Sequence, residues 1–255
     1  MAEGLLRGTR AVVTGAGSGI GRAIAHRLRA LGADLVLMGR DIAKLDDTAK
    51  AIGGGEPIGC DVSDARNVET AFAKLRERPL HILVNNAGVA RSAKLVDTTD
   101  AVWDEMLRVN LTGAFHCARA ALPMLANAPF GRIVNIASTA GLIGYPHVVA
   151  YCAAKHGVVG LTRALALEYA RTTLTVNAVC PGYVDTPMTD ATIARLAQAT
   201  SRTPAEARAM LERRNPQRRL VSPEEVAEAV GWLCLPASQS ITGQAISISG
   251  GEVAR

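Results

Sequence analysis

Short β-branched runs alternate along the whole chain with segments long enough to form helices. The first such run lies at 10–14 and the last at 245–248, and helical patterns fill most of the intervals between them. This order is typical of parallel strands connected by helices that cover both faces of one sheet. We therefore predict an α/β fold with a doubly wound parallel sheet, organised as a single domain over residues 1–255.

The positions of the apolar runs define the expected elements. Strands are expected at 10–14, 34–38, 57–60, 82–85, 132–137, 175–179 and 245–248. Helices are expected at 20–31, 65–75, 100–125, 151–170 and 223–233. Only residues 186–220 depart from this alternation of strands and helices. Their sequence is helical and rich in arginine, although a short connection between the flanking elements would suffice.

The composition suits one globular body and excludes a nucleic-acid binder. Of the 255 residues, 49% are hydrophobic and 20% are charged, which allows one large core. Aromatic residues make up only 4%, too few for a base-stacking surface. No nucleic-acid motif accompanies the net charge of +5, so that charge does not indicate such a partner.

The cysteines and the apolar segments indicate the compartment. The five cysteines are odd in number and form no C-x-x-C pair, so neither a disulfide framework nor a metal site is expected. No apolar run approaches the roughly 18 residues of a membrane span, and the first residues show no leader pattern. We expect a cytoplasmic protein with no membrane partner.

A glycine-rich segment, TGAGSGIG at 14–21, follows the first expected strand and opens the first expected helix. Glycines allow the backbone to approach a pyrophosphate, and the helix start stabilises its charge. A plain strand-to-helix turn would need one glycine rather than four in seven residues. The segment therefore predicts nucleotide binding.

The end of the second expected strand bears on cofactor choice. An NAD site usually places an acid here for the ribose 2′-hydroxyl, whereas this chain has Gly39 followed by Arg40. Because an arginine can pair with a 2′-phosphate, NADP(H) is favoured and NAD(H) remains possible. The alternative is that Arg40 only solvates the turn, and Asp41 beside it weakens the positive field.

Polar residues also follow the third and fourth expected strands. Asp61, which precedes Val62, can accept a hydrogen bond from an adenine amino group, or it can help to start the next helix. The segment NNAG at 85–88 reads either as a further part of the nucleotide site or as a turn with special backbone angles.

The segment YCAAK places Tyr151 and Lys155 four residues apart, on one face of a helix. A positive charge near a phenol lowers its pKa, and a shift from about 10 to about 7 requires roughly 4 kcal/mol. The pair is therefore a candidate acid–base. The alternative is a tyrosine on a helix shoulder beside an ordinary surface lysine. Ser138 precedes Tyr151 by 13 residues and can hydrogen-bond a substrate oxygen.

Taken in order, TGAGSGIG, NNAG, Ser138, YCAAK and PGYVDT resemble the short-chain dehydrogenase/reductase family in its short form. The resemblance covers nearly the whole chain, from Thr14 to Gly251. It implies a Rossmann fold with a helical substrate lid at about 186–220, and a homotetramer with helices 100–125 and 151–170 at its interface. The segment VNAVCPGYVDTPM is also similar to polyketide and acyl-thioester ketoreductases.

The resemblance implies a catalytic tetrad of Asn110, Ser138, Tyr151 and Lys155. Tyr151 would protonate the carbonyl oxygen as hydride arrives, and Lys155 would lower the phenol pKa and hold the nicotinamide ribose. Ser138 would orient the carbonyl, and Asn110 would anchor a water relay. The expected cofactor contacts are Gly15, Gly17, Ser18, Gly19, Ile20, Gly21, Arg40, Asp61, Val62, Asn86, Ala87, Gly88, Tyr151, Lys155, Pro181, Gly182, Val184 and Thr186.

These observations predict an oxidoreductase that interconverts a ketone and a secondary alcohol with NADP(H). A 3-oxoacyl thioester, carried by coenzyme A or an acyl carrier, is one substrate that the resemblance suggests. The alternatives are an NAD-dependent secondary-alcohol or hydroxyacyl dehydrogenase, a non-catalytic dinucleotide-binding regulator, and a sugar-nucleotide epimerase. A regulator has no need of the whole tetrad, and the chain is short for an epimerase.

The substrate side of the site is less defined. Residues expected to shape the pocket, without identifying a molecule, are Tyr145, Pro146, His147, Val148 and Met188. Residues 186–220 hold seven arginines against three acidic side chains, a net of +4. Such a basic lid suits an anionic substrate such as an acyl-CoA. Alternatively, the arginines solvate two lid helices or pair across a subunit interface.

Overall fold

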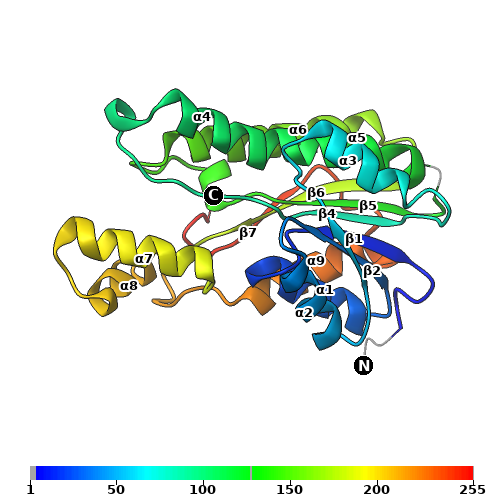
Figure 1. Ribbon diagram of the computed structural model, residues 1–255, viewed down its shortest axis with the longest axis horizontal. Coiled ribbons are helices and arrows are strands. Elements are labelled where there is room, and N and C mark those ends of the chain that lie inside the picture. Colours follow the sequence, from blue (N-terminus) through cyan, green and yellow to red (C-terminus); the bar gives the residue numbers. More distant parts are fainter. Residues whose placement is uncertain (1–3, 127, 255) are drawn as a thin grey trace.

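The computed structural model describes residues 4–126 and 128–254 and contains one parallel sheet with helices on both faces (Figure 1). The strand order is β3-β2-β1-β4-β5-β6-β7, and every pairing is parallel. The strands are β1 (Arg10–Thr14), β2 (Asp34–Gly39), β3 (Glu56–Gly59), β4 (Ile82–Asn85), β5 (Gly131–Ile136), β6 (Leu174–Pro181) and β7 (Ala245–Ile248). The order reverses between β1 and β4, and this switch point opens a crevice at the carboxyl ends of the strands.

The helices cover the sheet in two layers. On one face lie α1 (Gly19–Ala30), α2 (Ile42–Ala51) and α9 (Pro223–Cys234) (Figure 1). On the other lie α3 (Ala65–Ala73), α4 (Asp100–Leu107), α5 (Gly113–Leu125) and α6 (Val149–Glu168). Side chains alternate between the two cores along each strand, so Val12 packs with the second layer and Val13 with the first.

Residues 186–220 form a separate helical pair beyond the edge of the sheet. These helices are α7 (Pro187–Thr200) and α8 (Pro204–Glu212), and a small apolar cluster of their own holds them together. α8 starts at a capping box of Thr203 and Glu206. A parallel bridge between Val184 and Val221 joins the two ends of the insertion at its base.

The predicted fold class is confirmed, and each expected strand agrees with the structure to within two residues at either end. The expected helix at 100–125 is wrong as one element, because a π-helical turn at Arg108–Thr112 separates α4 from α5. At this turn Asn110 Nδ2 donates to the carbonyl oxygens of Met106 and Val89, both at 3.0 Å. Hydrophobic periodicity does not register such a turn.

Candidate active site

The glycine-rich segment forms the turn between β1 and α1. Gly15 and Gly19 have φ of +64° and +50°, a left-handed conformation that side chains other than glycine rarely adopt. A side chain at Gly21 would overlap the carbonyl oxygen of Gly15. α1 begins after Ser18 with no acidic residue in its first turn. Its N–H groups and positive dipole end therefore suit the pyrophosphate of a dinucleotide.

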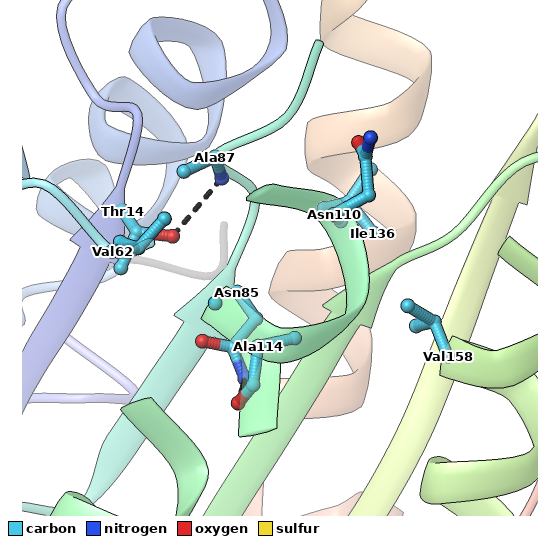
Figure 2. A pocket seen from close by; sticks show the side chains of 9 residues that line it. Thr14, Val62, Asn85, Ala87, Asn110, Ala114, Ile136 and Val158 are labelled. Atoms are coloured by element: carbon cyan, nitrogen blue, oxygen red, sulfur yellow. Dashed lines mark hydrogen bonds between the residues drawn. The ribbon is translucent and has the colours of Figure 1, made fainter. Parts of the chain in front are cut away.

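The NNAG segment after β4 is tied to the end of β1. Thr14 Oγ1 accepts hydrogen bonds from the N–H groups of Asn86 and Ala87 at 2.9 and 3.0 Å, and Figure 2 shows the second. Asn86 Nδ2 donates to the carbonyl oxygens of Thr14 and Gly15 at 2.9 and 3.3 Å. These bonds bring the two candidate nucleotide segments together at the switch point.

A small cavity beneath this junction shows which elements converge there. Figure 2 shows it between the strand ends and the turn that carries Asn110. Its lining residues are Thr14, Val62, Asn85, Ala87, Asn110, Gly113, Ala114, Ile136 and Val158. They come from β1, β4, β5, the π-helical turn, α5, α6 and the loops after β3 and β4, so this edge of the sheet gathers segments that are distant in sequence.

Asp61 follows β3 and holds the turn that precedes α3. Its Oδ1 accepts a hydrogen bond from the Ser63 N–H at 2.9 Å, whereas Asp64 is the N-cap of α3. Burial acts to raise the pKa of Asp61, but the Ser63 hydrogen bonds and the nearby charges of Arg40 and Arg108 hold it below its usual value. Asp61 therefore does not start the helix and stays ionised beside two arginines.

Arg40 is exposed at the end of β2, and no ion pair engages it among the residues described. The neighbouring Asp41 caps α2 through the Lys44 N–H at 3.3 Å and pairs with Lys44 Nζ at 3.5 Å. A Cβ at Gly39 would meet Leu45 at 3.4 Å, an ordinary contact. The guanidinium is thus open to an anionic ligand, and position 39 has room for a side chain.

The candidate acid–base group lies at the start of α6. Tyr151 lies near Ser138, the residue two places beyond β5, so its phenol and the Ser138 hydroxyl are neighbours. Lys155 is 4% exposed, and its Nζ donates to the carbonyl oxygen of Ile136 at 2.8 Å and lies 5.6 Å from the centre of the Tyr151 ring. The phenol, the hydroxyl and the ammonium are therefore together, as the sequence predicts.

The fourth expected tetrad member, Asn110, faces the same place from the π-helical turn. Its Oδ1 accepts from the Val89 N–H at 3.2 Å. A Cβ at Gly88 would lie 2.7 Å from this oxygen and 3.7 Å from Lys155 Nζ. The space that a Cβ would fill at Gly88 therefore adjoins both the amide of Asn110 and the ammonium of Lys155, and the glycine is required by space rather than by its backbone angles.

The expectation that Lys155 lowers the pKa of Tyr151 is not met in the free protein. Burial raises the pKa of Tyr151 to about 12, and the Ser138 hydrogen bond only partly offsets that effect. Burial also lowers the pKa of Lys155 to about 8. The physical reason is geometric, since the ammonium is directed at the Ile136 carbonyl oxygen and faces the ring instead of the hydroxyl.

The segment after β6 closes the nucleotide side of the crevice. A Cβ at Gly19 would lie 3.2 Å from Thr186 Cγ2, so this segment meets the glycine-rich turn. The Thr189 hydroxyl donates to the Val184 carbonyl oxygen at 2.5 Å, which fixes the backbone before the lid. The segment at Thr186 and the turn expected to bind the pyrophosphate are therefore adjacent.

Sequence reasoning missed a cluster on the substrate side. The Tyr145 hydroxyl lies 2.9 Å from Thr139 Oγ1 and 2.8 Å from Glu252 Oε1. The guanidinium of Arg214 lies over the Tyr145 ring, 5.3 Å from its centre. Glu252 follows the last strand and lies more than 100 residues from its partner, and no local pattern marks such a contact.

Partners account for several of the lid arginines. Arg208 pairs with Asp185 at 2.7 Å and Glu212 at 2.9 Å, and Arg219 pairs with Glu225 at 2.6 Å. Arg213 and Arg218 are exposed and form no ion pair with any residue that the structure describes. Ion pairs among the described residues therefore engage two of the seven lid arginines.

Two further searches cover the described part of the chain. No group of three or more histidine, cysteine or acidic side chains is placed to hold a metal ion there. No helix in residues 4–126 or 128–254 is long and apolar enough to cross a membrane.

The parallel sheet, the glycine-rich turn at its switch point and the phosphate-compatible helix start define a dinucleotide-binding protein of the Rossmann class. A sequence model of the family described as enoyl-(acyl carrier protein) reductase matches residues 15–252. The chain belongs to the short-chain dehydrogenase/reductase family, and it is an NAD(P)-dependent oxidoreductase acting on CH–OH groups. The predicted family and enzyme class are thereby confirmed.

Three similar proteins illustrate the range of the relatives. The "putative ketoacyl reductase 1" of the granaticin polyketide synthase from Streptomyces violaceoruber is 42% identical, over 94% of this chain and 92% of its own. A D-beta-hydroxybutyrate dehydrogenase from Cupriavidus necator is 38% identical, over 98% of this chain and 100% of its own. The crystal structure of a variant actinorhodin polyketide ketoreductase with NADPH gives a TM-score of 0.92 at 39% identity, over 96% of this chain and 97% of its own.

Proposed function

We propose that the protein reduces the 3-oxo group of an acyl thioester or a similar ketone with NADPH, and that Asn110, Ser138, Tyr151 and Lys155 carry out the chemistry. The closeness of the Tyr151 phenol to the Ser138 hydroxyl and to the buried Lys155 ammonium is the observation that carries this proposal. It sets a protonated phenol and a second hydroxyl at one point of the crevice, where both can reach a single carbonyl oxygen.

Each group has a distinct task in this proposal. NADPH, when bound, supplies the hydride that reduces the carbonyl carbon. Tyr151 Oη gives its proton to the carbonyl oxygen, and Ser138 Oγ orients the same oxygen. Lys155, whose ammonium is held by the Ile136 carbonyl oxygen, supplies positive charge near the phenolate that remains. Proton replacement runs past Lys155 toward Asn110, and both side chains border the space left by the missing side chain of Gly88.

The cofactor assignment rests on the donor set at the switch point. The segments that would hold the dinucleotide are residues 15–21, Arg40, Asp61 with Val62, Asn86 to Gly88, and Pro181 to Thr186. NADPH is favoured over NADH because Arg40 forms no ion pair in the described chain and Gly39 replaces the acid of an NAD site. The similar actinorhodin enzyme was crystallised with NADPH, which supports the same choice.

The substrate assignment rests on the relatives and on the lid. The names of the granaticin and actinorhodin proteins place both in polyketide synthesis, where ketoacyl groups are reduced. We propose that residues 1–255 form a single domain in which α7 and α8 cover the substrate. Exposed apolar side chains on α4, α5 and α6, namely Trp103, Phe115 and Leu167, support a homotetramer, which the mass of the protein in solution tests.

The decisive experiment measures the rate of NADPH oxidation with each member of a panel of substrates. Acetoacetyl-CoA, ethyl acetoacetate and an aryl ketone test for ketone reduction, and crotonyl-CoA tests for enoyl reduction. We expect turnover of the two 3-oxo compounds and none of crotonyl-CoA. Reduction of crotonyl-CoA alone would replace this proposal by an enoyl reductase. Oxidation of a secondary alcohol with NAD alone would favour the NAD-dependent dehydrogenase.

A further inference from the structure

A half-buried carboxylate lies on the substrate side of the crevice, and the proposed chemistry does not use it. Glu252 accepts a hydrogen bond from the Tyr145 hydroxyl at 2.8 Å. A Cβ at Gly182 would lie 3.1 Å from the other carboxylate oxygen, so the side chain is packed against the segment that follows β6. Glu252 is therefore fixed between two loops of the site rather than free in solvent.

This carboxylate is connected to the catalytic serine through a short chain of groups. An ionised carboxylate can only accept, so the Tyr145 O–H is directed at Glu252 and the Thr139 hydroxyl donates to Tyr145, 2.9 Å away. Thr139 follows Ser138 directly in the chain. The charge of Glu252 therefore lies beside Tyr145, a residue expected to shape the substrate pocket, and one hydroxyl away from the neighbour of Ser138.

Two cations lie on the substrate side of the crevice. One of them, Lys155, already has a hydrogen-bond acceptor, and the other, Arg214, is more exposed than Glu252. Lys155 donates to the Ile136 carbonyl oxygen, and Arg214 is exposed and stacks on the Tyr145 ring. Solvent screens the exposed Arg214 more than the half-buried Glu252. A substrate with a free carboxylate beside its ketone would meet the half-buried Glu252 on this wall, whereas Arg214, the cation beside it, is exposed to solvent.

We propose that Glu252 is a specificity-determining residue that excludes free 3-oxo and 3-hydroxy acids and admits the same skeleton only as a neutral ester, thioester or ketone. The inference rests on the proposed function, since it assumes reduction of a 3-oxo group at Ser138 and Tyr151. It refines that function, because it separates a reductase of acyl thioesters from a dehydrogenase of free hydroxy acids on the basis of one charge.

The test compares two substrates that differ in one charge. Ethyl acetoacetate and acetoacetate share the reacting ketone, and the ratio of kcat/KM for acetoacetate to that for ethyl acetoacetate measures the discrimination. In Glu252→Gln, the side chain keeps its shape and can still accept from Tyr145. We expect this substitution to raise the ratio about fivefold or more, because it removes a like charge near the acid.

Tyr145→Phe is the matched variant, since it deletes the hydrogen bond and keeps the charge. We expect its ratio to stay within about twofold of the wild-type ratio.

The pH dependence of the same ratio in the wild type adds a measurement that needs no variant. Burial raises the pKa of Glu252, and the hydrogen bond from Tyr145 and the charge of Arg214 partly offset that rise. The negative charge of Glu252 is therefore lost as pH falls. The wild-type ratio should therefore rise as pH is lowered toward 5, while acetoacetate stays ionised, and the Glu252→Gln ratio should not.

Two results would overturn the inference. One is an unchanged ratio in Glu252→Gln together with a pH-independent wild-type ratio. The other is an equal change in Glu252→Gln and Tyr145→Phe, which would assign both residues to holding the loop. Failure of the proposed function gives a different result, because the wild type would then reduce neither ethyl acetoacetate nor acetoacetyl-CoA.

Discussion

Two opposing effects set the pKa of Tyr151. Burial raises its pKa to about 12, whereas the hydrogen bond with Ser138 favours the phenolate. The phenol is therefore fully protonated at neutral pH, the form that a carbonyl reduction requires. In the reverse direction the phenolate is required, so alcohol oxidation should accelerate as pH rises while reduction changes little.

Replacement of Tyr151 by Phe tests this role. It removes the proton donor and leaves the nucleotide segments intact, so we expect kcat to fall at least about a hundredfold with little change in the NADPH dissociation constant. Steady-state kinetics measure kcat, and fluorescence titration measures the NADPH dissociation constant. Tyr169→Phe, at the other end of α6, is the matched control. A Tyr151→Phe enzyme that kept a tenth of wild-type kcat would rule out the assignment.

Arg40 and Gly39 allow a second prediction at the residue scale. A guanidinium–phosphate contact contributes about 1.5–3 kcal/mol, or roughly ten- to a hundredfold in preference for NADPH. The Gly39→Asp, Arg40→Ala double variant should reverse that preference. The aspartate is accommodated because a Cβ at Gly39 makes only an ordinary contact with Leu45 at 3.4 Å. The measurement is kcat/KM with each cofactor, and a wild type that used NADH equally well would contradict it.

At the scale of elements, Arg132 joins three segments at the edge of the sheet opposite the site. It is fully buried at the start of β5, and no carboxylate pairs with it among the residues described. Its guanidinium instead donates to the carbonyl oxygens of Gly131, Thr173 and Leu235 and to Gln239 Oε1, at 2.7–3.3 Å. Leu235 is the C-cap of α9, so the positive charge also interacts favourably with the negative end of that helix dipole.

We expect Arg132→Met to lower the free energy of unfolding by about 2 kcal/mol or more, because several buried acceptors lose their donor. Arg78→Met, which removes an exposed arginine paired with Asp34 at 2.8 Å, should cost less than about 1 kcal/mol. Urea denaturation measures both. Equal effects would show that the buried contacts contribute nothing specific.

The elements also show what the sequence can and cannot predict. The β-branched runs locate the strands to within two residues because burial on both faces requires continuous apolar segments. The turn around Asn110 escapes prediction because its extra residue is held by side-chain bonds to Val89 and Met106, which periodicity does not report. At the site, the local motifs identify Ser138 and Tyr151, whereas Glu252 acts through a contact that only the tertiary fold creates.

At the scale of the whole molecule, charge is separated between the inner and outer parts of the substrate side. Glu252 lies inside, beside Tyr145, and the unpaired arginines Arg213 and Arg218 are exposed on the segment that leads from the end of α8 back to the base of the lid insertion. This arrangement fits a substrate that is neutral at its reacting end and anionic at its far end. The phosphates of an acyl-CoA provide such a far end, and their attraction to the lid is a long-range, salt-sensitive effect.

The Arg213→Ala, Arg218→Ala double variant tests the outer charge. Arg214 is left in place because it stacks on Tyr145 and serves the pocket wall. We expect KM for acetoacetyl-CoA to rise about threefold or more and to lose much of its salt dependence, while KM for ethyl acetoacetate stays the same. The Arg76→Ala, Arg171→Ala double variant removes equal charge from exposed turns at the opposite edge of the sheet and controls for net charge. Parallel changes for both substrates in the lid variant would assign these arginines to the structure of the lid, because only the CoA substrate carries the phosphates that they are proposed to attract.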